Sequence, residues 1–230
     1  MNILIGERYS DKLLKPLISQ GFQVLLAPTN PLVDPRLSGH IDLSAIMPDK
    51  NKIVLSHNLT GSEMIVNSFT NAGIEIFNAI YNQNAEYPND AALCACVCGE
   101  TLIHNTKITD PAITSQFRGK TIHINQGYAN CCICAVNNSS IITSDKGIAT
   151  KLRTEGFEVL EIEQGLVALD GFDYGFIGGA SFKANNTIYF TGRFPANTET
   201  IIEEFISRHK MSCVYLTEYQ AFDIGGAIVF

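Results

Sequence analysis

Acidic side chains recur along the chain at nearly regular intervals. Asp42, Asp90 and Asp223 share one place in short stretches that resemble one another, and Asn130 and Phe176 stand at the matching place in two further copies. The five positions are separated by 48, 40, 46 and 47 residues. Carboxylates gathered in a half-buried site repel one another, which raises their pKa values unless a cation lies among them. If the fold brings these positions together, the predicted ligand is a cation: a guanidinium, an amine or a metal ion.

A histidine accompanies the first of these carboxylates. His40 stands two residues before Asp42, and in a strand both side chains would leave on the same face. An imidazole beside a carboxylate can transfer protons near neutral pH. We therefore take His40 and Asp42 as candidate catalytic residues, with a purely structural histidine as the alternative.

The seven cysteines include two tight groups, CACVC (94–98) and CCIC (131–134). Paired C-x-x-C arms, which are typical of zinc sites, are absent from the sequence, and no metal site is predicted from the cysteines. Free cysteines are usually small buried hydrophobic residues. In a strand, Cys132 would share a face with Asn130, so Cys132 is the candidate nucleophile among them.

The stretches that carry these residues belong to a repeat. They are HIDLSAI (40–46), PNDAALC (88–94), YANCCIC (128–134), YGFIGGA (174–180) and AFDIGGA (221–227). A second apolar strand, a helix-compatible stretch and a third strand follow each of the first four copies; in the fourth these are IYFTGR (188–193), ANTETIIEEFISRHK (196–210) and SCVYLTEY (212–219). The repeating unit is predicted to be strand–strand–helix–strand.

The fifth copy is interrupted by the chain ends. Its first strand is DIGGAIVF (223–230), and the remainder stands at the N-terminus as NILIGER (2–8), YSDKLLKPLISQG (9–21) and FQVLLAP (22–28). We predict a single α/β domain over residues 1–230, a ring of five units closed by pairing of the N-terminal and C-terminal strands. Such closure removes the exposed sheet edges that promote aggregation.

A ring of five such units resembles the pentein superfamily, the five-fold α/β propeller of the guanidino-group-modifying enzymes. HIDLSAI, YPNDAA, SIITSDKGIA, GFIGGAS and FDIGGA are most similar to an uncharacterised bacterial branch of that fold. The resemblance covers the whole chain. It implies a ligand at the narrow end of the central channel, a cysteine nucleophile in the last unit, a histidine acid/base, and carboxylates that hold a guanidinium.

One part of the family pattern is missing from this chain. The resemblance places the nucleophile three or four residues after Gly226, where this sequence has Val229 and Phe230. Neither side chain can attack a guanidinium carbon, which requires a thiolate or an activated hydroxyl. An H-x-D pair like that of His40 and Asp42 also occurs in arginine deiminases, although here it lies in a different unit.

Several residues are expected to bind the ligand. They are Asp90, Asn130, Phe176 as a stacking wall, Asp223, the backbone of Gly225 and Gly226, and two guanidinium forks for a ligand carboxylate, Arg8 and Arg193. The alternative interpretation is that the Asp and Asn side chains cap backbone N–H groups and that the two arginines are solvated surface residues.

Composition narrows the choice of partner. The net charge of −7 argues against non-specific binding to nucleic acid or to a membrane surface, and no apolar run approaches the ~20 residues of a membrane span. We expect a reduced, cytoplasmic protein without an organic cofactor, because phosphate-binding glycine loops are absent. The preferred function is binding of a small cationic, arginine-like molecule, with guanidine hydrolysis or transfer left open. The alternatives are a non-catalytic interaction module and a metal-dependent hydrolase that uses His40 and the acidic ring.

Overall fold

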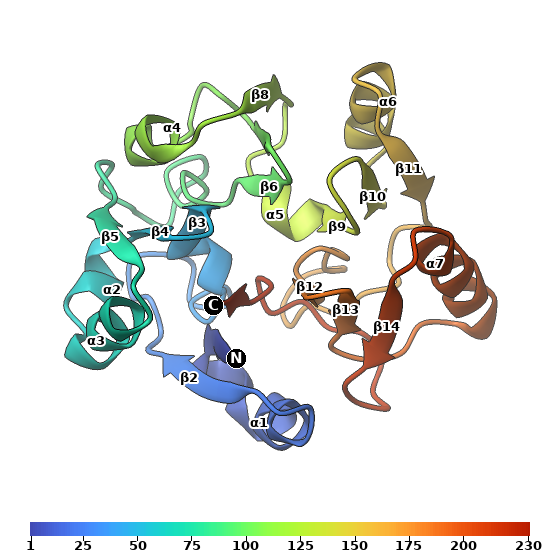
Figure 1. The fold of residues 1–230 in the computed structure, drawn as a ribbon, viewed down its shortest axis with the longest axis horizontal. Helices are drawn as coiled ribbons and strands as arrows, with labels where there is room; N and C mark the ends of the chain where they lie inside the picture. The colour runs from blue at the N-terminus through green and yellow to red at the C-terminus, as the bar shows by residue number, and fades with distance from the viewer.

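The protein consists of five three-stranded sheets arranged around a common centre (Figure 1). A computed structural model describes all residues from Met1 to Phe230. In every sheet the middle strand pairs antiparallel with an inner strand and parallel with an outer strand. The inner strands lie nearest the centre of the ring in Figure 1. The predicted α/β ring of five units is confirmed.

The strands fall into three sets that recur in every unit. The inner strands are β3 (Ala45–Asp49), β6 (Cys96–Cys98), β9 (Cys134–Ala135), β12 (Ser181–Ala184) and β15 (Ile228–Val229). The middle strands are β1 (Asn2–Gly6), β4 (Lys52–Leu55), β7 (Thr101–His104), β10 (Ser140–Thr143) and β13 (Thr187–Phe190). The outer strands are β2 (Gln23–Ala27), β5 (Glu75–Asn78), β8 (Lys120–His123), β11 (Glu158–Glu161) and β14 (Ser212–Tyr215).

A helix joins the middle strand to the outer strand in each unit, because parallel neighbours need a crossover connection. These helices are α1 (Ser10–Ser19), α3 (Glu63–Asn71), α4 (Pro111–Gln116), α6 (Lys146–Thr154) and α7 (Ala196–Arg208); short turns are α2 (His57–Thr60), α5 (Ala129–Cys132) and two 3₁₀ segments, η1 (Glu7–Tyr9) and η2 (Ile41–Leu43). Two of the crossover helices begin at aspartate caps: Asp110 accepts a hydrogen bond from Ala112 N at 2.8 Å, and Asp145 accepts one from Ile148 N at 2.9 Å. None of the helices combines the length and hydrophobicity that a membrane span requires.

The ring closes where the two ends of the chain meet. Strand β15 pairs antiparallel with β1, with Ile3 opposite Val229 and Leu4 opposite Ile228. Asn2 N donates to Phe230 O at 2.8 Å, and Phe230 N donates to Asn2 O at 3.0 Å. The predicted pairing of the terminal strands is therefore confirmed.

The segments that precede the inner strands are not strands, contrary to the prediction. His40 stands immediately before the 3₁₀ turn η2, which contains Asp42, and Asn130 and Cys132 lie in the helical turn α5. The inner strands begin only after these turns. Strand alternation consequently does not decide where these side chains point. The turns bring Asp42 and Asn130 together, whereas Cys132 packs among apolar residues.

Candidate ligand site at the ring axis

Two cavities lie near the centre of the ring. The first, of about 580 Å³, is bounded by inner strands β3, β6 and β15, and Asp42, Asn130 and Gly225 line it. The second, of about 540 Å³, is lined by His40, Cys131, Asp223 and a largely apolar wall. Because Asp42 contacts Cys131 through a hydrogen bond, these polar side chains lie between the two cavities.

His40 and Asp223 meet at the floor of the second cavity. His40 Nδ1 lies 3.8 Å from Asp223 Oδ1, and the two side chains are 2% and 1% exposed. Asp223 accepts hydrogen bonds from Phe176 N and Gly225 N, both at 2.9 Å. Burial raises the pKa of the Asp223 carboxyl, and the nearby His40 opposes that rise. His40 Nε2 is buried and has no hydrogen-bond partner.

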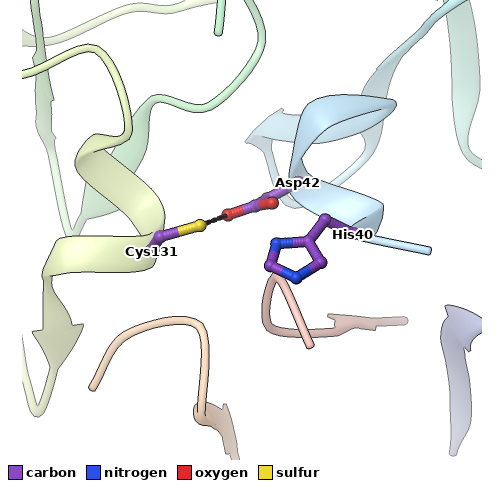
Figure 2. Close-up of side chains that lie close together, drawn as sticks. All are labelled: His40, Asp42 and Cys131. Atoms are coloured by element: carbon purple, nitrogen blue, oxygen red, sulfur yellow. Dashed lines mark hydrogen bonds between the residues drawn. The ribbon is translucent and has the colours of Figure 1, made fainter. Parts of the chain in front are cut away.

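Asp42 is the centre of a second polar contact. Its Oδ2 accepts hydrogen bonds from the thiol of Cys131 at 2.9 Å, the thiol of Cys94 at 3.1 Å and Asn130 Nδ2 at 3.1 Å. Figure 2 shows the Cys131 sulfur directed at this carboxylate, with the His40 ring beside it. Asp42 Oδ1 is buried without a partner. One carboxylate oxygen thus receives three donors while its twin receives none.

Aromatic rings form much of the wall of the second cavity. Tyr87 and Tyr128 lie with ring centroids 5.6 Å apart, and Tyr174 meets Phe176 edge to face at 5.9 Å. Phe172 also lines this wall. Aromatic faces attract cations, and the attraction strengthens where water is excluded. The cavity therefore combines a buried carboxylate with rings suited to a cationic group.

Asp90 does not join the other two aspartates, which corrects the expectation of three carboxylates in one channel. The hydroxyl of Tyr128 donates to Asp90 Oδ2 at 2.5 Å, and Asp90 Oδ1 is buried without a partner. Neither axial cavity includes Asp90 in its lining. Burial raises the pKa of this carboxyl. Tyr128 thus stands between Asp90 and the cavity that Tyr128 itself lines.

Glycines allow backbone to approach these side chains. Gly225 has a φ of +71°, and a Cβ there would lie 2.6 Å from Asp42 Oδ1 and 2.6 Å from His40 Cβ. Asp42 N donates to Gly225 O at 3.3 Å. Gly226 also has positive φ, and a Cβ there would meet Asn130 Nδ2 at 3.3 Å. Both positions favour glycine on backbone grounds alone.

The structure gives Cys132 a different place from the one expected. Its side chain packs in an apolar cluster with Ile133, Ile141 and Cys96 rather than against the polar groups of the axis. Burial raises the pKa of the Cys132 thiol well above its usual value. Because α5 is helical, Cys131 instead faces Asp42, and its pKa is also raised, first by its contact with Cys94 and then by burial. Both thiols are protonated at neutral pH.

The two predicted guanidinium forks lie elsewhere and line neither axial cavity. Arg8 donates to Pro35 O at 2.9 Å on the surface. Arg193 pairs with Glu199 at 2.8 Å and stacks 4.4 Å from the ring of Tyr215. The guanidinium of Arg193 is therefore held by this chain's own carboxylate and aromatic ring.

Sequence reasoning missed Cys94, Cys131 and the tyrosines of the cavity wall. The two cysteines stand in the repeated stretches, but strand alternation assigned Cys131 to the opposite face from Asn130. Tyr128 opens the third copy and Tyr174 the fourth, two residues before Asn130 and Phe176 respectively. Because both tyrosines stand at the same place in the repeat, this shared position could have identified them as wall residues.

Solved structures with the same fold cover nearly the whole chain. Dimethylarginine dimethylaminohydrolase from Pseudomonas aeruginosa, a cysteine-to-serine mutant complexed with citrulline, is 11% identical, with a TM-score of 0.56 over 100% of this chain and 98% of that one. Agmatine deiminase from C. jejuni is 10% identical, with a TM-score of 0.54 over 94% and 87%. An amidinotransferase of saxitoxin biosynthesis from Microseira wollei is 10% identical, with a TM-score of 0.52 over 97% and 93%.

These TM-scores establish the shared pentein fold. At sequence identities this low they do not establish a shared activity. No curated protein sequence matches the chain. Residues 4–228 match the model of a family described as a family of unknown function, DUF6873. The chain therefore belongs to that family, which in this member has the pentein fold.

Proposed function

We propose that the protein binds a small organic cation, a guanidinium or an amine, in the aromatic-lined cavity. One observation carries the proposal: Asp223 is a buried carboxylate that lines a cavity of about 540 Å³ whose other walls are mostly apolar and aromatic. Its one basic neighbour within 4.0 Å is His40. A bound cation would compensate a charge that burial disfavours.

The cavity offers a cation three kinds of contact. Asp223 presents a carboxylate at the floor, and each of its oxygens has accepted one backbone N–H, which leaves further acceptor capacity. Phe176 and Tyr174 offer ring faces and edges at the wall. Asp173 adds an exposed carboxylate to the lining. A flat guanidinium can use carboxylate and ring together.

The chemistry of the cavity favours binding over covalent catalysis by a thiol. Cys131 is the thiol in the lining, and its hydrogen bond to Asp42 and its raised pKa keep it protonated. The last unit supplies Val229 and Phe230 in place of a nucleophile. The ligand class is supported by the names of the structural neighbours, a dimethylarginine hydrolase and an agmatine deiminase, which act on guanidino compounds.

Calorimetry and thermal melting with arginine, agmatine and guanidinium test the proposal. A ligand that binds the folded state raises the free energy of unfolding by mass action, by about 2.7 kcal/mol at a concentration 100-fold above its dissociation constant, and so raises the melting temperature. Asp223→Asn should remove this response. Asp145→Asn is the matched control, because Asp145 also holds a backbone amide but lies outside the cavity.

Failure of every guanidino compound and amine to bind the unmodified protein would contradict the proposal. An equal loss of binding in Asp223→Asn and Asp145→Asn would contradict it as well, since the response would then follow general destabilisation. Binding should also persist in the presence of a chelator, because a guanidinium is held by carboxylate and rings and needs no metal.

A further inference from the structure

Four potential metal ligands from three units converge on the ring axis. His40 and Asp42 precede β3, Cys94 precedes β6, and Cys131 precedes β9. The ligand atoms of His40, Asp42 and Cys131 all lie within 4.8 Å of one another. Cys94 Sγ lies 3.1 Å from Asp42 Oδ2 and 3.9 Å from Cys131 Sγ.

These spacings are close to those of a tetrahedral metal site. Metal–sulfur and metal–nitrogen bonds of about 2.0–2.3 Å place neighbouring ligand atoms about 3.3–3.8 Å apart. The Cys131–Asp42, Cys94–Asp42 and Cys94–Cys131 separations are 2.9, 3.1 and 3.9 Å. The thiol–thiol separation is close to this range, the two thiol–carboxylate separations are somewhat shorter, and the His40 ligand atom lies within 4.8 Å of those of Asp42 and Cys131.

Two potential metal-ligand atoms of this cluster have no hydrogen-bond partner. His40 Nε2 and Asp42 Oδ1 are both buried and unsatisfied, and their residues are 3% exposed. A buried polar atom without a partner is costly, so native proteins rarely retain one without compensation. A metal ion would supply the missing partner for the imidazole or the carboxylate.

We propose that His40, Asp42, Cys94 and Cys131 bind a transition-metal ion of the Zn²⁺ class. Thiolate and imidazole ligands select Zn²⁺ and similar ions over Mg²⁺ and Ca²⁺, which prefer all-oxygen sites. Binding replaces the S–H bonds of Cys94 and Cys131 with two S–metal bonds and releases two protons to solvent. Four protein ligands make a closed site, so the ion would join three units at the axis rather than activate water.

Two cavities border this cluster. His40 and Cys131 line the aromatic cavity, while Asp42 lines the other one. The metal site adjoins the proposed organic-cation site, because His40 and Cys131 line the same cavity as Asp223. Asp223 is not among the four ligands, so replacing it distinguishes failure of one proposal from failure of the other.

Cobalt titration of the reduced, chelator-treated full-length protein is the direct test. Co²⁺ bound by thiolates absorbs through sulfur-to-cobalt charge transfer, and we expect this absorption to saturate at equimolar Co²⁺ and to disappear when Zn²⁺ is added. Protons should be released during the titration. Mg²⁺ should produce neither change, and Zn²⁺ should raise the melting temperature.

Variants assign the ligands. Cys131→Ser and Asp42→Asn should each weaken Co²⁺ binding by more than ~10-fold, since loss even of an outer-sphere partner costs 10–100-fold. Cys213→Ser is the matched control, because Cys213 lies in β14 away from the axis. Asp223→Asn should lose arginine binding but retain the cobalt spectrum.

The measurement on the unmodified protein decides the matter even if a variant fails to fold. Absence of charge-transfer absorption from the reduced protein would overturn the proposal. An equal loss of Co²⁺ binding in Cys213→Ser and Cys131→Ser would also overturn it, because cobalt would then be held by scattered thiols.

Discussion

The imidazole of His40 lies 3.8 Å from the carboxylate of Asp223, in a contact between two neighbouring units of the ring. Strand β15, which follows Asp223, closes the last unit, whereas His40 leads into the next unit at β3. Both side chains are almost fully buried. Asp42 and Cys131 lie beside them on the same axis. Protonation of Asp223 is therefore governed by burial and by the charges of these neighbours.

The first prediction concerns pH and the binding of a cation. Burial raises the pKa of Asp223 above its usual value. A cation is attracted to the ionised carboxylate, so arginine binding should weaken as pH falls through this raised pKa, at a higher pH than for an ordinary aspartate near about 3.9. Calorimetric titration of arginine across acidic pH measures this step. An affinity that stays constant down to the ordinary aspartate range would contradict it.

The second prediction concerns His104, which is buried in β7. Its Nε2 lies 2.7 Å from Gly127 O and its Nδ1 lies 2.8 Å from Thr109 Oγ1. Burial lowers the pKa of His104 from 6.5 to about 4, so below pH 6.5 the unfolded chain binds a proton that the folded protein does not. Stability should therefore be lost as pH falls from 6.5 to 4, by up to about 3 kcal/mol.

Urea unfolding of the protein and of His104→Gln at several pH values measures this contribution. The difference between their unfolding free energies should change over that pH window and be flat above it, because only one of the two proteins carries the buried imidazole. The same slope in both proteins would assign the acid sensitivity to other groups.

The third prediction uses a glycine that touches the site. A Cβ at Gly179 would collide with Oδ1 of Asp223, whose position the backbone amides of Phe176 and Gly225 fix. Gly179→Ala should lower stability by about 1–3 kcal/mol and abolish arginine binding, since relief of the clash displaces the carboxylate. Gly61→Ala is the control: its Cβ has no neighbour closer than 3.8 Å, and its change in stability should stay within ~0.5 kcal/mol.

The fourth prediction concerns the seven thiols. Six are buried, and Cys213 is half-buried. Because reaction requires an accessible thiolate, Cys213 should be alkylated by iodoacetamide before the other six, and all should react more slowly than free cysteine. Peptide mass spectrometry after timed labelling gives the order. Faster labelling of Cys131 or Cys132 would identify an activated nucleophile and favour an enzyme.

The fifth prediction concerns the seam of the ring. The rings of Phe230 and of Phe69 in α3 pack with their centroids 4.3 Å apart. Phe230→Ala should lower stability by about 1–3 kcal/mol through the loss of this half-buried contact. Tyr219→Ala, at a position 65% exposed, should change stability by less than ~0.5 kcal/mol. Equal melting temperatures for Phe230→Ala and the unmodified protein would show that the seam contributes little to stability.

The five-unit architecture could be predicted from the sequence because each unit repeats the same order of apolar runs. The pairing of the N-terminal strand with the C-terminal strand followed from completing the interrupted copy, and the structure places Ile3 opposite Val229. Such a prediction needs only the period of the pattern. It does not depend on the rotation of any single side chain.

The site could be predicted only in part, because its residues stand in turns. The 3₁₀ turn at Asp42 and the helical turn at Cys131 are too short for a periodic signal, so alternation misassigned Cys132. Asp90 occupies an equivalent sequence position but is covered by Tyr128, a long-range contact that no local pattern specifies. Arg193 pairs with Glu199 in the helix of its own unit. This pairing depends on how the helix packs, which the sequence pattern does not show.

Asn2 and Phe230 are joined by backbone hydrogen bonds, so the ring does not depend on where along it the two ends lie. The turn between Asp49 and Lys52 joins an inner strand to a middle strand in the same antiparallel manner as β15 and β1 meet. A circular permutant, with the present ends joined by a short linker and new ends opened in that turn, would keep every sheet and the whole axial cluster. The order of the units along the chain is thus one of five orders that would give the same closed ring.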